Sequence, residues 1–276
     1  MPGKYINPYT DFGFKRIFGR EANKDILISF LNSLLPQRHQ IADLRFLNNE
    51  QTPPRREVYA PILDLFCESP SGEQFIVEMQ QENQGYFLDR TVYYTACAIR
   101  DQWERGQHNY RLAAVYFVGI MDFVHPFENS PPRLLHELSL KDQEGVEMYD
   151  KLRMYFIQMP LFKKSETELE TQLDKWLFFL KNLPGLDCIP AVLREPVFEK
   201  AFETAEKSTM TREEEIEYRI TREILYINKG VVETAEAKGE AKANFENARK
   251  MKALGLPVET IASVTGLAAA QIEEMK

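Results

Sequence analysis

The chain has 276 residues and a mass of 32.2 kDa, which suits one large domain or two modest ones with a substantial apolar core. Hydrophobic residues make up 44% and charged residues 28% of the sequence, so a wholly disordered, collagen-like or fibrous protein is excluded. The formal net charge of −8 argues against a strongly basic nucleic-acid coat. The acidic excess is greatest at residues 61–160, where 15 Asp and Glu accompany 8 Lys and Arg; this region is either a solvated surface or a cluster of carboxylates that needs a cation.

The sequence carries no signal for secretion or for a membrane. It has no run of 18 apolar residues, and residues 1–16 lack the apolar stretch of a secretory signal. Its three cysteines are too few for a disulfide framework, and their spacing matches no zinc motif. We therefore expect a protein of the reducing cytoplasm, without a membrane segment.

The first predicted elements are helices. Phe14, Ile17 and Phe18 follow Asp11 at helical spacing, and residues 23–35 carry a second set of apolar residues at that spacing, ended by Pro36. A loop that contains Pro-Pro-Arg-Arg at residues 53–56 follows.

The period then changes to two, which predicts a β-hairpin. Residues 58–67 and 75–79 are the two strands, and Ser-Pro-Ser-Gly at residues 69–72 is a turn signal between them. Beyond the hairpin, the pattern predicts a helix over residues 87–104 and a buried central strand over residues 112–121.

Two more strands are predicted, at residues 134–140 and 152–159, and then only helices. The helix predicted over residues 164–183 starts at Ser165-Glu166-Thr167-Glu168, a sequence typical of a capping box. A short helix is predicted at residues 197–206 and a long charged helix at residues 211–236. A weakly packed helical linker at residues 237–243 then leads to three short helices at residues 245–276. This order indicates a mixed α/β core at residues 1–183, a helical extension and linker at 184–244, and a small helical tail at 245–276.

Two acidic residues of the hairpin are predicted to face one another. If the turn is centred on Ser71, residues whose numbers sum to 142 lie opposite each other, which pairs Asp64 with Glu78. Directly opposed Cβ atoms lie ~4.5–5.5 Å apart, and like charges at that distance repel. Strand parity also puts Gln80 on the face of Glu78. Either this face is simply wet, or the two carboxylates hold a divalent cation such as Mg²⁺.

The order of these pieces resembles a known family. Asp64, a gap of thirteen residues and Glu78-Met79-Gln80 resemble the PD-(D/E)XK nuclease motif, with Gln80 in the place of the last lysine. The stretch Thr-Asp-Phe-Gly-Phe-Lys-Arg-Ile-Phe-Gly at residues 10–19 is similar to the opening of the Rpn family, the recombination-promoting nucleases also called PD-(D/E)XK family transposases. The resemblance covers about residues 4–183 and includes Arg90, Tyr93, Tyr94, Gly106, Tyr110 and Trp176.

The resemblance implies a restriction-endonuclease-like α/β core and a metal-dependent DNA endonuclease acting in recombination or transposition. Asp64 and Glu78 would hold Mg²⁺, with Mn²⁺ as a possible substitute, and the metal would polarise the scissile phosphate and activate a water. Gln80 would orient that water or a metal ligand through its amide, since it carries no charge. The substrate would be double-stranded DNA, and the fold analogy suggests a homodimer that cuts both strands.

Four further residues have two interpretations each. Asp11 is either a third acidic contact to the metal or water, or the N-cap of its helix. Lys15 and Arg16 either contact DNA phosphates or lie on a solvated helix face. Arg90 either binds a DNA phosphate or forms a salt bridge with Asp89 or Glu82. All four lie among the residues that carry the resemblance.

The tail at residues 257–276 is similar to a small helix-turn-helix, with Gly266 in the turn. Its second helix presents Glu273 and Glu274 and no arginine, so we favour a protein contact or packing over base reading. This leaves two functional hypotheses: a Mg²⁺-dependent DNA endonuclease, or a catalytically silent nuclease fold that binds another protein or another copy of itself.

Overall fold

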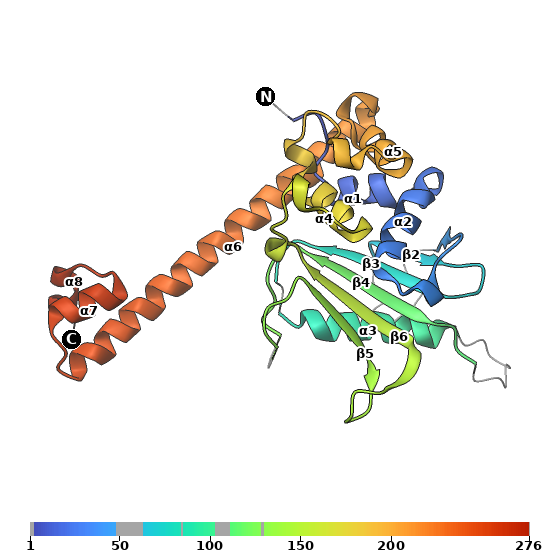
Figure 1. The fold of residues 1–276 in the computed structure, drawn as a ribbon. Helices are drawn as coiled ribbons and strands as arrows, with labels where there is room; N and C mark the ends of the chain where they lie inside the picture. Colours follow the sequence, from blue (N-terminus) through green and yellow to red (C-terminus); the bar gives the residue numbers. More distant parts are fainter. Residues whose placement is uncertain (1–2, 48–62, 84, 103–110, 128–129, 276) are drawn as a thin grey trace, which may run out of the picture. The chain divides into compact units, whose positions relative to one another are not determined.

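The computed structural model describes residues 3–47, 63–83, 85–102, 111–127 and 130–275. The chain divides into two compact units, Met1–Arg222 and Glu223–Lys276, and only the first contains a sheet within the described residues (Figure 1). No helix in these ranges has the length and hydrophobicity that crossing a bilayer requires.

Six strands of the described chain form one mixed sheet in the order β1-β2-β3-β4-β6-β5. Their bounds are Arg45–Phe46 for β1, Leu65–Glu68 for β2, Gln74–Gln80 for β3, Val115–Met121 for β4, Leu135–Lys141 for β5 and Glu147–Gln158 for β6. The central strands β3, β4 and β6 run parallel, whereas β1, β2 and β5 are antiparallel to their neighbours. Every residue of β4 is buried, which confirms the predicted central strand.

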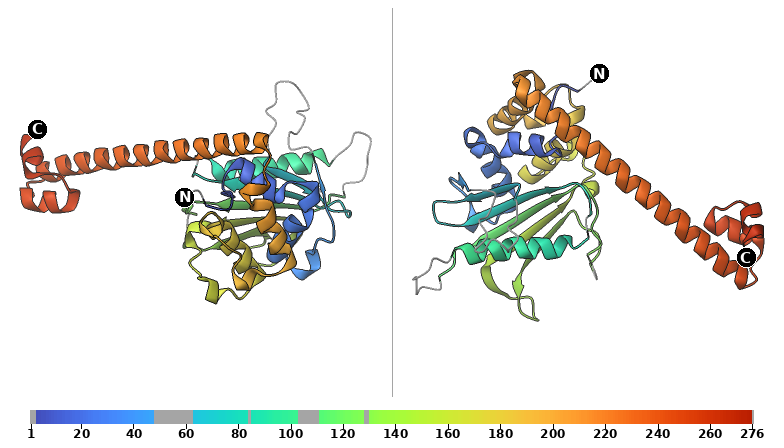
Figure 2. Two further views of the ribbon diagram at one scale, coloured as in Figure 1. Left: turned by 90° about the horizontal axis from the view of Figure 1, so that it is seen from above. Right: turned by 180° about the vertical axis from the view of Figure 1, so that it is seen from behind.

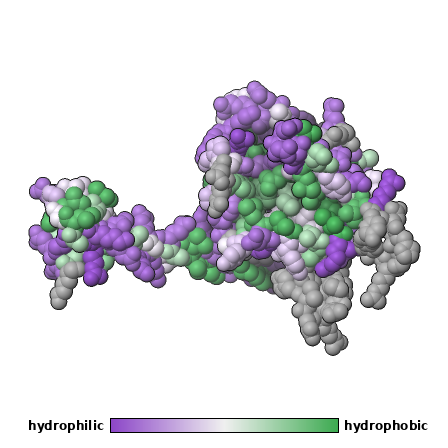
Figure 3. Space-filling view, turned by 90° about the horizontal axis from the view of Figure 1, so that it is seen from below, coloured by the Kyte–Doolittle hydropathy of each residue, from purple (hydrophilic) through white to green (hydrophobic). Residues whose placement is uncertain are grey.

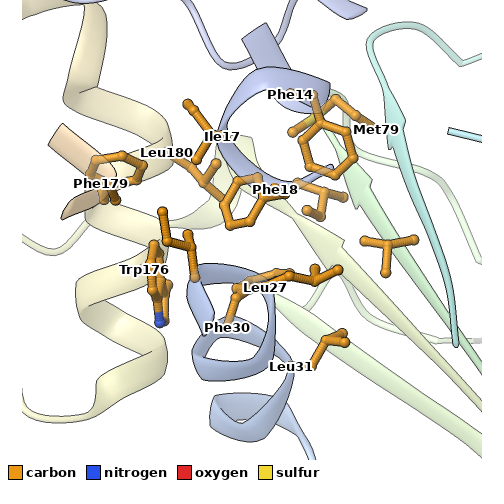
Figure 4. Packing of buried hydrophobic residues seen from close by; sticks show 14 of the residues in the cluster. Phe14, Ile17, Phe18, Leu27, Phe30, Leu31, Met79, Trp176, Phe179 and Leu180 are labelled. Carbon is orange, nitrogen blue, oxygen red and sulfur yellow. The ribbon is translucent and has the colours of Figure 1, made fainter. Parts of the chain in front are cut away.

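Helices cover both faces of this sheet (Figures 1 and 2). On one face lie α1, α2, α4 and α5, which span Asp11–Phe18, Lys24–Leu34, Gln172–Asn182 and Pro196–Ala205. Their aromatic side chains interlock around Trp176, whose ring centroid lies 5.9 Å from that of Phe18 and 4.3 Å from that of Phe198 (Figure 4). These apolar stripes at helical spacing form the main core and hold α1 against the sheet.

The opposite face is covered by α3, Phe87–Asp101. Phe87, Tyr94 and Ala98 of this helix belong to one buried cluster with Ile76 and Phe117 of the sheet. Over β5 and β6 an apolar groove of about 530 Å³ remains, and hydrophobic residues gather on this underside (Figure 3). Its apolar lining consists of Val92, Leu138, Leu140, Leu152 and Met154.

Several predicted boundaries differ from the structure. The described part of the first hairpin strand is β2, and residues 58–62 lie outside the described residues, as do residues 53–56 and 103–104. The helix predicted over residues 164–183 is interrupted: Ser165 and Glu168 cap a single 3₁₀ turn, Glu166–Glu168. Helix α4 starts at a second capping box, formed by Thr171 and Asp174. The Thr171 hydroxyl accepts a hydrogen bond from the Asp174 amide, and the backbone at Thr171 is extended.

The predicted linker at residues 237–243 is part of a continuous helix, α6, which spans Arg212–Ala253. Alanine, glutamate and lysine are strong helix formers, and together they outweigh the single Gly239. The division into units also falls after residue 222 and not after residue 183. The reason is that α5 contributes Phe198 and Phe202 to the main core.

The second unit is small and helical. The end of α6 packs with α7, Val258–Thr265, and α8, Ala269–Glu274, around Ala248, Ile261 and Ile272. Gly266 ends α7 with a positive φ of 70°, a backbone conformation that favours glycine. Two of the three predicted short helices are therefore separate elements, and the first is the end of α6.

The aromatic cluster predicts a stability effect. Trp176 is fully buried, so Trp176→Ala leaves a cavity between α1, α2 and α5. We expect a loss of about 3–5 kcal/mol in the free energy of unfolding, measured by urea denaturation. Tyr226→Ala, at a side chain that is 63% exposed, is the control and should change it by less than about 0.5 kcal/mol. Equal effects of the two substitutions would contradict the assigned core.

Candidate active site

The hairpin has the register that the sequence predicts. Leu65 of β2 lies opposite Val77 of β3, so the residue numbers sum to 142. The same register brings Asp64, one residue before β2, opposite Glu78. The site therefore lies at the end of the sheet where β3 finishes.

Two hydrogen bonds hold the acidic residues against one another. The Asp64 amide donates to Glu78 Oε1 at 3.0 Å, and the Met79 amide donates to Asp64 Oδ2 at 2.8 Å. Each carboxylate thus accepts a backbone hydrogen bond from the opposite strand. Gln80 joins them, because its Nε2 donates to Glu78 Oε2 at 3.1 Å. The three residues predicted on the hairpin lie together.

Glu78 is held in a poorly solvated position, with only 3% of its surface exposed. Its neighbour on β4 is Gly119. A Cβ atom on Gly119 would lie 3.1 Å from the ring of Phe117 and 3.3 Å from that of Phe156, so aromatic carbon fills the space beside Glu78. The absence of a side chain at residue 119 leaves room for these rings.

This environment raises the pKa of both carboxyl groups. For Glu78 the largest cause is burial, and the second is the charge of Asp64. For Asp64 burial again dominates, and the charge of Asp11 raises the pKa further. Hydrogen bonds to the carboxylates and the charge of Arg90 oppose these effects without cancelling them. Two negative charges at this site therefore repel one another, and a bound cation would stabilise the ionised form of both carboxyl groups.

Helix α1 brings Asp11 and Lys15 close enough to act on the charge of Asp64. They form an ion pair one helical turn apart, with Lys15 Nζ 2.7 Å from Asp11 Oδ1, and both side chains are about half-exposed. The N-cap interpretation of Asp11 is wrong. The cap is Thr10, whose hydroxyl accepts the Gly13 amide at 3.0 Å, and Asp11 occupies the first helical position.

Arg90 projects from α3 toward the same acidic residues, and its charge lowers the pKa of both. Its guanidinium carbon lies 5.6 Å from the centre of the Tyr94 ring. Tyr94 is buried in the core and Tyr93 is 39% exposed. Gly106 and Tyr110 lie outside the described residues.

Arg16 does not belong to this site, which corrects its interpretation as a DNA contact. The side chain is 5% exposed, and its guanidinium lies in the contact between α1, α5 and α6. It donates to the carbonyl of Thr204 at 2.8 Å and pairs with Glu214 at 2.6 Å. A phosphate cannot reach a group that is enclosed and paired in this way.

Sequence reasoning missed the link that fixes α1 over the hairpin. Gln81 directly follows the motif, and its Nε2 donates to the carbonyl of Tyr9, just before the helix. The Asp122 amide, which follows β4, donates to the carbonyl of Gln80 at 2.8 Å. Neither contact leaves a signal in a single sequence, because each depends on which loop ends meet.

The residues present suit a magnesium ion. Among the described residues no group of three or more His, Cys, Asp or Glu side chains has the arrangement of a protein-only metal cage. Mg²⁺ does not require one, since it is usually bound by one or two carboxylates plus waters and phosphate oxygens. Asp64 and Glu78 supply the two carboxylates, and each oxygen that accepts a hydrogen bond keeps a further lone pair.

The mixed sheet, its flanking helices and the acidic hairpin define a restriction-endonuclease-like α/β protein. A family model described as PD-(D/E)XK nuclease family transposase matches residues 8–235, and the chain belongs to this family. The match extends past the region of the sequence resemblance and includes α5 and the first half of α6. Searches of curated proteins and of solved structures found no match.

The raised pKa of Glu78 predicts how metal-free stability depends on pH. The folded protein favours the protonated form of the Glu78 carboxyl group. The stability that this preference contributes is fully present below the pKa of the unfolded chain, near 4.3, and is lost as the pH rises through the pKa of the folded protein. Glu78→Gln removes the charge, so we expect this variant to gain stability relative to wild type between pH 5 and pH 8.5. The gain should be roughly 2 kcal/mol, measured by urea unfolding in EDTA.

Glu144→Gln, at an exposed carboxylate, is the control for that series. Its stability difference from wild type should stay constant over the same pH range. A Glu78→Gln difference that is equally constant would mean that Glu78 ionises like a solvated residue.

Proposed function

We propose that the protein is a cytoplasmic, metal-dependent endonuclease that hydrolyses phosphodiester bonds of double-stranded DNA during recombination or transposition. The observation that carries this proposal is the pair of opposed carboxylates, partly exposed Asp64 and buried Glu78, on a hairpin of a nuclease-family fold. A purely structural site has no reason to keep two carboxylates whose charges repel.

Each residue of the hairpin has a distinct role in this proposal. Asp64 and Glu78 would hold Mg²⁺ or Mn²⁺, which when bound supplies a Lewis acid for the phosphate and a water of lowered pKa. The backbone amides of Asp64 and Met79 fix the two carboxylates before the metal arrives. Gln80 already touches Glu78, and rotation of its amide lets it accept or donate a hydrogen bond to the attacking water.

Two cationic side chains beside the site can bind the phosphates of DNA. Lys15 on α1 and Arg90 on α3 approach the acidic residues from two sides, and both act on the charge of Asp64. Ammonium and guanidinium groups are the usual partners of DNA phosphates. We propose that these two side chains face the DNA phosphate at Asp64 and Glu78, with Arg90 positioning the DNA backbone, while Asp11 contacts the metal-bound water or Lys15.

A second function is favoured by two apolar surfaces. The groove over β5 and β6 is lined by apolar side chains. Helix α6 also exposes a stripe of β-branched residues at helical spacing, Ile216, Ile220, Ile224, Ile227 and Val231. Such surfaces suit protein contacts. The alternative is therefore a nuclease fold that binds a protein without cleaving DNA; the homodimer and a partner of the C-terminal tail remain predictions.

Cleavage of plasmid DNA separates the two functions. Purified wild-type protein with Mg²⁺ should nick or linearise the plasmid, and EDTA should stop it. Asp64→Asn should lower the rate at least about 100-fold, because removal of one carboxylate weakens the metal site. The variant should keep or gain thermal stability, since the repulsion within the metal-free site is relieved.

Glu144→Gln, at an exposed carboxylate in the turn between β5 and β6, should cleave like wild type. Equal cleavage by wild type and Asp64→Asn would refute the assigned site. Absence of cleavage by wild type, together with no rise in melting temperature on adding millimolar Mg²⁺ or Mn²⁺, would favour the protein-binding function.

A further inference from the structure

The third residue of the motif carries no charge in this chain. The family description ends in lysine, and the corresponding residue here is Gln80. Its amide is engaged with Glu78 at 3.1 Å, and an amide cannot offset the negative charge that grows on a phosphate during hydrolysis. A cation from another element would add to the stabilisation that a metal held by Asp64 and Glu78 supplies to this charge.

Helix α1 lies directly against the frame of the acid pair. Phe14 packs beside Met79, the residue whose amide holds Asp64 (Figure 4). Gly19, the C-cap of α1 and five residues after Phe14, meets β2, because a Cβ atom there would lie 2.7 Å from a methyl carbon of Leu65. Lys15 lies between these two residues on α1, so the packing of the helix places this residue near the hairpin end where Asp64 lies.

The ammonium of Lys15 is positioned but not enclosed. Asp11 holds it at 2.7 Å, and 41% of the lysine side chain is exposed. Its charge acts on Asp64, which agrees with the packing. A lysine ammonium is compact, with three donors on a flexible stem, so it can turn from Asp11 to a phosphate oxygen without a change in the backbone.

The two arginines nearby are less suited to this role. Arg16 is enclosed between helices and paired with Glu214. Arg90 lies over the ring of Tyr94, a contact with the aromatic face that orients its guanidinium. Lys15 therefore combines nearness to Asp64 with freedom to move.

We propose that Lys15 is the catalytic cation of this site, taking from α1 the role that a lysine at residue 80 would have, and that Asp11 is the positioning residue that holds it. In the step, the water oxygen forms a bond to phosphorus and the water proton passes to solvent. The bond from phosphorus to the leaving oxygen breaks with its electron pair on that oxygen, which takes a proton from solvent. Lys15 keeps its proton and donates hydrogen bonds to the non-bridging oxygens, where negative charge accumulates. This inference rests on the proposed function.

Moving the charge tests the inference. With plasmid DNA and saturating Mg²⁺, Lys15→Met should lower kcat about 100- to 1000-fold and change KM by less than threefold. The double variant Lys15→Met with Gln80→Lys should recover at least tenfold of that loss, because the charge returns to the hairpin. Asp11→Asn should lower kcat less than Lys15→Met does. Lys24→Met removes a lysine of α2 that pairs with Asp43 at 2.7 Å, and it should cleave like wild type.

Metal binding gives a readout that does not depend on cleavage. Lys15→Met should keep the rise in melting temperature that Mn²⁺ produces in wild type, since Lys15 is not a metal ligand, whereas Asp64→Asn should lose it. Undiminished kcat in Lys15→Met would overturn the role of Lys15 and leave the nuclease proposal intact. A rise in KM alone would reduce Lys15 to a DNA contact, and absence of rescue by Gln80→Lys would mean that the loss is structural.

A wild-type protein that does not cleave, with Lys24→Met equally inactive, would overturn the nuclease proposal and the role of Lys15 with it. The two failures are distinguishable: the role of Lys15 fails alone only when wild type cleaves, whereas the nuclease proposal fails when wild type does not cleave.

Discussion

The structure depends on one unfavourable contact, the meeting of two carboxylates at the end of a buried hairpin. Asp64 and Glu78 lie opposite one another and share reciprocal backbone hydrogen bonds, while aromatic rings exclude water beside Glu78. Burial raises the pKa of both groups, and the charge of Asp64 raises the pKa of Glu78 further. The fold tolerates this contact because the surrounding core is large, and the contact becomes favourable when a divalent cation binds.

The remaining architecture serves to hold that contact and to surround it with charge. The aromatic cluster around Trp176 fixes α1 on the sheet, and Gln81 ties the start of that helix to the end of β3. On the other face, α3 brings Arg90 toward the same carboxylates. A negative pair thus lies between a helix that offers an ammonium and a helix that offers a guanidinium, an arrangement that suits a metal ion and a phosphate together.

The sequence alone was sufficient for the hairpin and its register, because period-two alternation and a Ser-Pro-Ser-Gly turn leave few ways to pair the strands. It was not sufficient where two local signals competed. Asp11 and the preceding Thr10 are both good caps, and only the backbone geometry shows that threonine takes the role. The fate of Arg16 depended on α5 and α6, nearly 200 residues away, which no local pattern reveals. Gly239 does not break α6, because strong helix formers surround it.

The carboxyl group of Glu78 itself provides the most direct test. Its ionisation can be followed by ¹³C NMR of selectively labelled, metal-free protein, with Asp64→Asn as the partner-free comparison. We expect a titration midpoint well above the usual value near 4.3, a lower midpoint in Asp64→Asn, and a return toward the usual range when Mg²⁺ is added. An ordinary midpoint in all three samples would contradict the existence of a strained acid pair that needs a cation.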